Sequence, residues 1–454
     1  MALILHSCLY ASCPHSLPPA FELPMNRLIV SACFFLAVST GSFAGDIDRE
    51  PINYAASPDD NVVTQLMKKL DSGETTIPNE KGLGYLRGLL RELKIPESSQ
   101  VLVFSKTSLQ RHRISPTSPR ALYFNDDVYV GFCQNGDVAE VSATDPKLGT
   151  VFYTLNQKDK ARPRFTRQNE TCMICHASSQ NDGFPGHLVR SVFTDGDGLP
   201  LLASGTYRID QNSPLNQRWG GWYVTGTSGK QTHLGNKIFE DRTSTENHES
   251  TDGVNVTDLK KYFDTKRYLT PHSDIVVLMV LEHQAQMHNL ITRANFLARQ
   301  ALYEEVDLNK AFGRTEPGHT ESTIHRIQNA GEPLVRYMLF SEEAQLTDKI
   351  TGTSKFTEEF AKRGPFDKKG RSLRDFDLQT RLFKYPCSYL VYSPSFDQLP
   401  QEVKEYVYKR LWTVLTGTET STAFIRLSLS DRQAIREILL DTKPGLPAYW
   451  RESK

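Results

Sequence analysis

The segment Cys172-Met173-Ile174-Cys175-His176 constrains this chain more than any other stretch of its sequence. Two cysteines separated by two residues, with a histidine directly after the second, form the motif that attaches a c-type haem covalently. The two thiols can add to the vinyl groups at one edge of the porphyrin, while the imidazole binds the iron as its proximal ligand. The motif occurs once in the sequence, so we expect one haem c per chain.

Two other chemistries use a Cys-x-x-Cys pair. A structural zinc site needs further ligands at close spacing, and the four cysteines that follow residue 44 leave no second such pair. A thioredoxin-like redox pair stands in a β-α-β context, which the flanking sequence does not have. Haem attachment therefore explains the motif better than either alternative.

The N-terminus predicts export. Residues 25–27 are a short basic segment (Met-Asn-Arg), and residues 28–38 are an apolar run of 11. In the segment Ser42-Phe43-Ala44, the first and last residues are small and stand at the two positions that a signal peptidase reads. Eleven apolar residues are too few to span a bilayer, so we expect a cleaved signal peptide. On this interpretation residues 1–44 are an upstream extension plus signal peptide, translation starts at Met25, and the mature chain is periplasmic or otherwise exported.

The charge composition limits the classes of possible partner, and the cysteine content limits the possible disulfides. The 53 basic and 53 acidic side chains cancel, which argues against nucleic acid as a partner, and we expect no transmembrane segment in the mature chain. If haem takes Cys172 and Cys175, then Cys133 and Cys387 remain as an even pair that could form a disulfide in an oxidising compartment. Two separate buried thiols are the equal alternative, because sequence does not show whether their Cα atoms are close.

Three regions follow residue 44. Residues 45–157 combine two amphipathic helices with β-rich runs separated by turn residues, which predicts an antiparallel meander. Residues 158–302 form the haem-binding cytochrome region, with a hairpin, an aromatic glycine-rich segment and a long helix over residues 274–302. Residues 303–454 form a mainly helical C-terminal region. We therefore expect an α+β fold, in which an N-terminal antiparallel β-rich part precedes a mainly α-helical half and haem is held between them.

Turn and capping residues mark several boundaries. A helix with an apolar face ends at Gly73, and Pro400 opens a helix that Gly417 closes. Ser430 and Gln433 predict a capping box for the last helix. The expected strands cover residues 101–104, 121–124, 128–132, 138–141 and 151–155.

The distal side of the iron has several candidate ligands. His283 lies on the apolar stripe of the long helix, where an unpaired imidazole is costly to bury, and Met287 lies one turn further on the same face. His288 lies roughly 140° away around the helix, so it cannot share this role with His283. His233, in a glycine-flanked loop, is the rival candidate, and we rank His283 first, His233 second and Met287 third. The alternatives are a hydrogen-bonded core histidine for His283 and an exposed loop histidine for His233.

Haem also brings two propionates and a large apolar face. Arg190, Arg218 and the basic segment 162–164 are candidate propionate partners, because guanidinium groups suit carboxylates. Trp219 and Trp222 are candidates for packing on the porphyrin ring. Solvated surface arginines and ordinary core tryptophans are the alternative interpretations.

Over residues 172–176 the chain resembles c-type cytochromes, and from Asn169 to His283 it is similar to large exported proteins that carry a cytochrome c domain. The resemblance implies thioether attachment through both cysteines, axial ligation by the adjoining histidine, and electron transfer with a redox protein or a small-molecule donor or acceptor. Unlike small soluble cytochromes c, this chain has β-hairpin sequence after the motif, which argues against the usual distal-methionine loop.

Two functions compete on this evidence. A six-coordinate haem would make the protein an electron carrier. An open distal position would make it an oxidoreductase such as a peroxidase, with Glu282, His283 or an arginine handling protons. A haem-based sensor or binding module is a third possibility.

Overall fold

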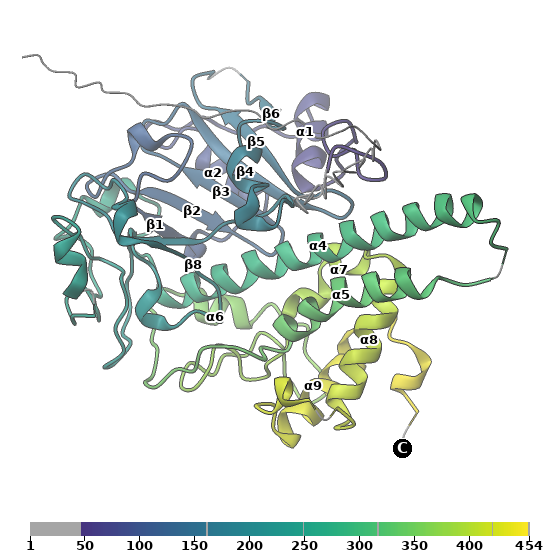
Figure 1. The fold of residues 1–454 in the computed structure, drawn as a ribbon. Coiled ribbons are helices and arrows are strands. Elements are labelled where there is room, and N and C mark those ends of the chain that lie inside the picture. The colour runs from purple at the N-terminus through teal and green to yellow at the C-terminus, as the bar shows by residue number, and fades with distance from the viewer. Residues whose placement is uncertain (1–46, 160–161, 248, 316, 420, 453–454) are drawn as a thin grey trace, which may run out of the picture. The chain divides into compact units, whose positions relative to one another are not determined.

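The structure is a computed structural model that describes residues 47–452 apart from residues 160–161, 248, 316 and 420. The expected upstream extension and signal peptide lie outside these residues. The described residues contain nine α-helices and nine strands (Figure 1). The helices are α1 (Val62–Ser72), α2 (Leu86–Glu92), α3 (Met173–His176), α4 (Ile275–Ala311), α5 (Glu321–Met338), α6 (Phe356–Ala361), α7 (Pro394–Asp397), α8 (Gln401–Leu415) and α9 (Leu429–Thr442). The strands are β1 (Val101–Val103), β2 (Arg120–Phe124), β3 (Val128–Phe132), β4 (Val138–Asp145), β5 (Gly149–Asn156), β6 (Phe165–Arg167), β7 (Arg190–Val192), β8 (Thr206–Arg208) and β9 (Trp222–Tyr223).

The N-terminal half is an antiparallel meander, as predicted. Seven strands form one sheet in the order β6-β5-β4-β3-β2-β1-β9, so strands β1 to β6 lie beside one another in chain order. The longest ladder joins β4 to β5, from Val138 opposite Asn156 to Asp145 opposite Gly149. Strand β9 pairs with β1 and was not predicted, because two residues are too short to show an alternating pattern.

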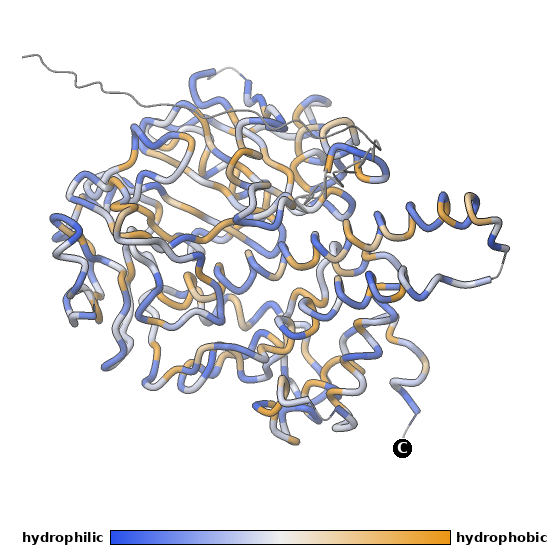
Figure 2. The backbone as a smooth tube through the Cα atoms, in the orientation of Figure 1, coloured by the Kyte–Doolittle hydropathy of each residue, from blue (hydrophilic) through white to orange (hydrophobic). Residues whose placement is uncertain are grey.

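The two faces of the sheet pack against different helices, because successive side chains of a strand point to opposite faces. Leu102 and Val130 lie in an apolar cluster with residues of α1 and α2. Val103 and Tyr129 lie in a second cluster with residues of α4, α5 and α8. Figure 2 shows hydrophobic residues on the strands and along α4. The sheet is thus covered by the N-terminal helices on one face and by α4 on the other.

Helix α4 organises the second half of the fold. It begins after Asp274, whose side chain accepts a hydrogen bond from the Val276 N–H, and it extends well beyond the predicted end at Leu302. Every residue from Ile275 to Ala285 is buried, so this part of the helix is enclosed on all sides and has no single apolar stripe.

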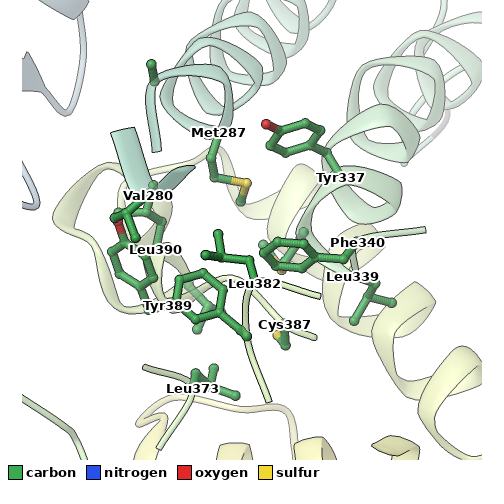
Figure 3. Packing of buried hydrophobic residues seen from close by; sticks show 14 of the residues in the cluster. Val280, Met287, Tyr337, Leu339, Phe340, Leu373, Leu382, Cys387, Tyr389 and Leu390 are labelled. Carbon is green, nitrogen blue, oxygen red and sulfur yellow. The ribbon is translucent and has the colours of Figure 1, made fainter. Parts of the chain in front are cut away.

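Helices α5 and α8 continue the packing beyond α4. Met287, Tyr337, Phe340 and Cys387 lie around one apolar core in this region (Figure 3). Cys387 and Cys133 are both buried and free, which corresponds to the alternative of two separate thiols and not to a disulfide. The chain after β9 is therefore mainly helical, and the α+β prediction is confirmed.

Most predicted helix ends are confirmed, and one is wrong. Helix α1 ends at Gly73, which has a left-handed φ of 75°, and Pro400 is the N-cap of α8. The last helix has its capping box at Ser428 and Asp431, not at Ser430 and Gln433. The short Asp431 carboxylate reaches back to the Ser428 N–H, which places Ser430 inside the first turn.

All the described residues belong to one compact unit, so the three regions predicted after residue 44 are parts of a single fold. Among these residues, no helix combines the length and the apolar composition that crossing a membrane requires.

Candidate functional site

The floor of the candidate site is a row of side chains across three strands. Tyr129 of β3 lies opposite Ser142 of β4, and Ser142 lies opposite Phe152 of β5. Residues directly opposite one another in antiparallel strands project from the same face of a sheet. Tyr129 belongs to the cluster that includes α4, so the row lies on the face covered by α4.

The Cys-x-x-Cys-His motif forms a single helical turn beside this row. The Cys172 carbonyl accepts hydrogen bonds from the N–H groups of Cys175 and His176, at 3.3 and 3.0 Å. Cys172 is partly buried and Cys175 is exposed, and both thiols are free. Ile174, between the cysteines, is 76% exposed. One turn therefore presents two accessible thiols and an imidazole, as covalent haem attachment requires.

Gly186 holds His176 by two hydrogen bonds, one to its backbone and one to its imidazole. The Gly186 N–H donates to the His176 carbonyl at 3.0 Å, and the Gly186 carbonyl lies 2.8 Å from Nδ1 of the imidazole. A carbonyl only accepts, so Nδ1 carries the proton and Nε2 keeps its lone pair. Nε2 has no hydrogen-bond partner among the described residues. The Phe152 ring packs on the imidazole at 4.5 Å between centroids.

The neutral state of the His176 imidazole also favours metal binding at Nε2. Burial lowers the pKa of His176, against the opposing effect of the Gly186 hydrogen bond, so the imidazole is neutral near pH 7. A neutral imidazole with a fixed tautomer is the form that binds a metal ion. Burial also raises the pKa of Cys172 to about 11, so this thiol stays protonated and uncharged.

An ion pair between Arg120 and Glu140 lies near the motif, and sequence analysis missed it. Both side chains exert an electrostatic effect on Cys172 and on His176. Gly131 makes room for the pair, because a Cβ there would lie 2.2 Å from Nη2 of Arg120. The only sequence signal was a charged residue at an inward position in each of two apolar strands.

Two histidines that the sequence analysis did not propose as iron ligands contact the same row of strand side chains on which His176 packs. Nε2 of His187 lies 2.8 Å from the Ser142 hydroxyl, and the His187 ring lies 4.0 Å from the Tyr129 ring. Nδ1 of His288 lies 3.1 Å from the Tyr129 hydroxyl. Burial lowers the pKa of His288 to about 4 and holds the pKa of His187 well below its usual value, so both rings are neutral. Among the described residues, Nδ1 of His187 and Nε2 of His288 are buried without a hydrogen-bond partner.

The structure does not bring His283 or Met287 together with the motif. Nδ1 of His283 bonds to the Gln211 side chain, and Nε2 lies 2.8 Å from the Ser388 hydroxyl. The His283 ring stacks on Phe340 with centroids 4.6 Å apart. Met287 lies in the apolar core of the C-terminal half (Figure 3). His283 thus has the contacts of a hydrogen-bonded core histidine, which was the alternative interpretation.

His233 is also buried, at 2% exposure, so the alternative of an exposed loop histidine is wrong. Its Nδ1 accepts a hydrogen bond from the Gly235 N–H at 3.1 Å, and its ring lies 5.3 Å from that of Trp219. These contacts belong to the aromatic, glycine-rich segment and not to the haem motif.

The residues predicted to bind propionates or the porphyrin ring either have polar partners within the protein or, in the case of Trp219, are buried in its core. Arg218 pairs with the fully buried Glu282 at 2.8 Å. Trp219 is completely buried, and Nε1 of Trp222 donates to the Arg190 carbonyl at 2.7 Å. The Arg190 side chain donates to the Thr206 hydroxyl at 3.1 Å. In the basic segment, Arg162 pairs with Asp71 and Arg164 with Asp159, at 2.6 and 3.9 Å.

Within the described ranges, no three His, Cys, Asp or Glu side chains gather where they could hold a metal ion by themselves. Comparisons of the chain with protein-family models, curated proteins and solved structures found no match.

Proposed function

We propose that this protein is an exported c-type cytochrome that transfers electrons through one haem c, attached to Cys172 and Cys175 with His176 as proximal ligand. The observation that carries the proposal is the His176 imidazole, whose Nδ1 is bonded to the Gly186 carbonyl and whose Nε2 is left available. A metal-binding histidine characteristically binds the metal through one ring nitrogen and donates the N–H of the other to a carbonyl, a carboxylate or water. The resemblance to c-type cytochromes and the predicted signal peptide point to the same function.

The protein's own residues have separate tasks in this proposal. The cysteines hold the porphyrin edge, Gly186 keeps the proton on Nδ1, and the Phe152 ring limits the access of water to the imidazole. When bound, the haem supplies the one-electron chemistry. Ile174 and Cys175 are exposed, so the attached edge of the haem would lie near the surface, within reach of a redox partner protein or a small donor or acceptor.

An oxidoreductase with an open distal position is the second candidate. The observation that favours it is the pair His187 and His288, which places two neutral, buried imidazoles with unpaired nitrogens near the motif. Such groups can accept protons during turnover. Glu282 and His283, which the sequence suggested for this role, already have partners in the core.

Optical spectra separate the two candidates. For an electron carrier we expect a low-spin ferric spectrum that cyanide and peroxide leave unchanged. A high-spin ferric spectrum that peroxide converts would contradict the carrier and support the oxidoreductase. Replacing His176 by alanine should abolish the covalent haem spectrum, whereas the matched variant His325→Ala, at an exposed position on α5, should keep it.

A further inference from the structure

We infer that Asn289 of α4 is a positioning residue for His176, and that it acts through the backbone of Gly186 and His187. The inference rests on the proposed haem function, because it assigns Asn289 a part in setting the properties of the proximal ligand. No sequence pattern indicated it, since Asn289 is a single polar residue far along the chain from the motif.

The amide of Asn289 makes two hydrogen bonds with one residue. Its Oδ1 accepts from the His187 N–H at 2.8 Å, and its Nδ2 donates to the His187 carbonyl at 2.8 Å. Asn289 is 6% exposed, so these bonds are shielded from water. A side-chain amide that pairs with both backbone groups of one residue fixes that residue much as a neighbouring strand would.

The fixed residue directly follows the one that holds His176. Gly186 makes its own two hydrogen bonds to His176, one to the backbone and one to the ring. Two hydrogen bonds therefore join Asn289 to His187, and two more join the preceding residue, Gly186, to His176, one of them to the ring. Because α4 is firmly packed, these hydrogen bonds can fix the orientation of the His176 imidazole.

The packing around Gly186 leaves no room for a side chain at this position. A Cβ at this position would lie 2.2 Å from Oδ1 of Asn289 and 2.1 Å from Nδ2 of Asn181. The Asn181 amide is itself held by a hydrogen bond to the Phe184 carbonyl at 2.7 Å. The Gly186 backbone is thus packed closely against two asparagine side chains.

The hydrogen bond from Nδ1 of His176 to the Gly186 carbonyl would influence the reduction potential of a bound iron. A strong Nδ1–H···O=C bond increases the basicity of the imidazole and stabilises ferric relative to ferrous iron. If the hydrogen bonds of Asn289 are lost, the Gly186 carbonyl can move, and its hydrogen bond with Nδ1 of His176 weakens. The reduction potential of the haem then rises.

The test measures the midpoint potential of the purified holoprotein. In Asn289→Leu we expect reduction to become favoured about tenfold, which is about 59 mV for a one-electron couple. The matched control is Asn295→Leu on the same helix. Asn295 is 4% exposed, and its side chain donates a hydrogen bond to the Pro146 carbonyl at 3.1 Å. We expect the control to keep the wild-type potential while it loses a similar amount of stability.

An unchanged potential in Asn289→Leu, or equal shifts in both variants, would overturn the inference. If the leucine variant does not fold, Asn289→Ser replaces it, because serine is too short to reach both backbone groups and fills less of the site. A positive shift in the serine variant supports the inference, and an unchanged potential overturns it. Wild-type protein that carries no haem would instead refute the proposed function, so the two failures are distinguishable.

Discussion

Replacing His283 by leucine separates a distal iron ligand from a core histidine. The buried ring bonds to Gln211 and to the Ser388 hydroxyl, and leucine makes neither bond. Each buried partner left without a hydrogen bond costs about 1–3 kcal/mol. Gln211 keeps its bond to the Tyr337 carbonyl at 2.9 Å, and leucine restores part of the packing against Phe340. We therefore expect a loss of about 2–4 kcal/mol in the free energy of unfolding.

Urea unfolding of the holoprotein measures this loss, and the ferric spectrum of the same sample reports the iron ligands. We expect a lower unfolding midpoint with an unchanged spectrum. The control His325→Leu changes an exposed histidine and should alter stability by no more than about 0.5 kcal/mol. Conversion of the His283 variant to a high-spin spectrum with wild-type stability would refute this reasoning and make His283 the distal ligand.

Three further predictions follow from particular contacts. Arg218→Met leaves the Glu282 carboxyl buried without its cation, so we expect urea unfolding to show a loss of about 3–5 kcal/mol in the free energy of unfolding. We expect the haem spectrum to stay unchanged, because the Arg218 guanidinium is already paired with Glu282. Cys172→Ala should leave the haem linked through Cys175 alone, and a pyridine haemochrome band moved toward that of unattached haem would show this. The His319–Glu305 contact at 2.6 Å raises the pKa of His319, so its stabilisation is complete below the ordinary histidine pKa of 6.5 and is lost as pH rises through the raised pKa. Amide exchange at the start of α5 checks this sign, because its protection relative to the intrinsic rate at each pH should fall above neutral pH.

Local patterns predicted much of the fold. The meander was predictable because β1 to β5 combine β-branched and aromatic residues with turn residues between them. The two residues of β9 could not be found, since their strand character comes only from pairing with β1. The length of α4 was underestimated because Glu305 is its one buried residue after Leu302, so no apolar face marks its last turns.

The candidate site was predictable only where it is contiguous in sequence. The motif at residues 172–176 has a fixed spacing within five residues, so the sequence alone is enough to recognise it. His187 and His288 meet Tyr129 only through sheet register and the docking of α4, which no local pattern encodes. Helical spacing placed His283 on a buried face correctly, but it could not show that Gln211 and Ser388 supply both hydrogen bonds there.

The covalent haem is the central claim, and its most direct test is a pyridine haemochrome assay with intact-protein mass spectrometry. The protein is made in a host that attaches haem c, and the double variant Cys172→Ala, Cys175→Ala is the control. We expect a c-type haemochrome spectrum and a mass equal to the mature chain plus one haem, with both features lost in the control. A wild-type mass equal to that of the polypeptide alone would contradict the account.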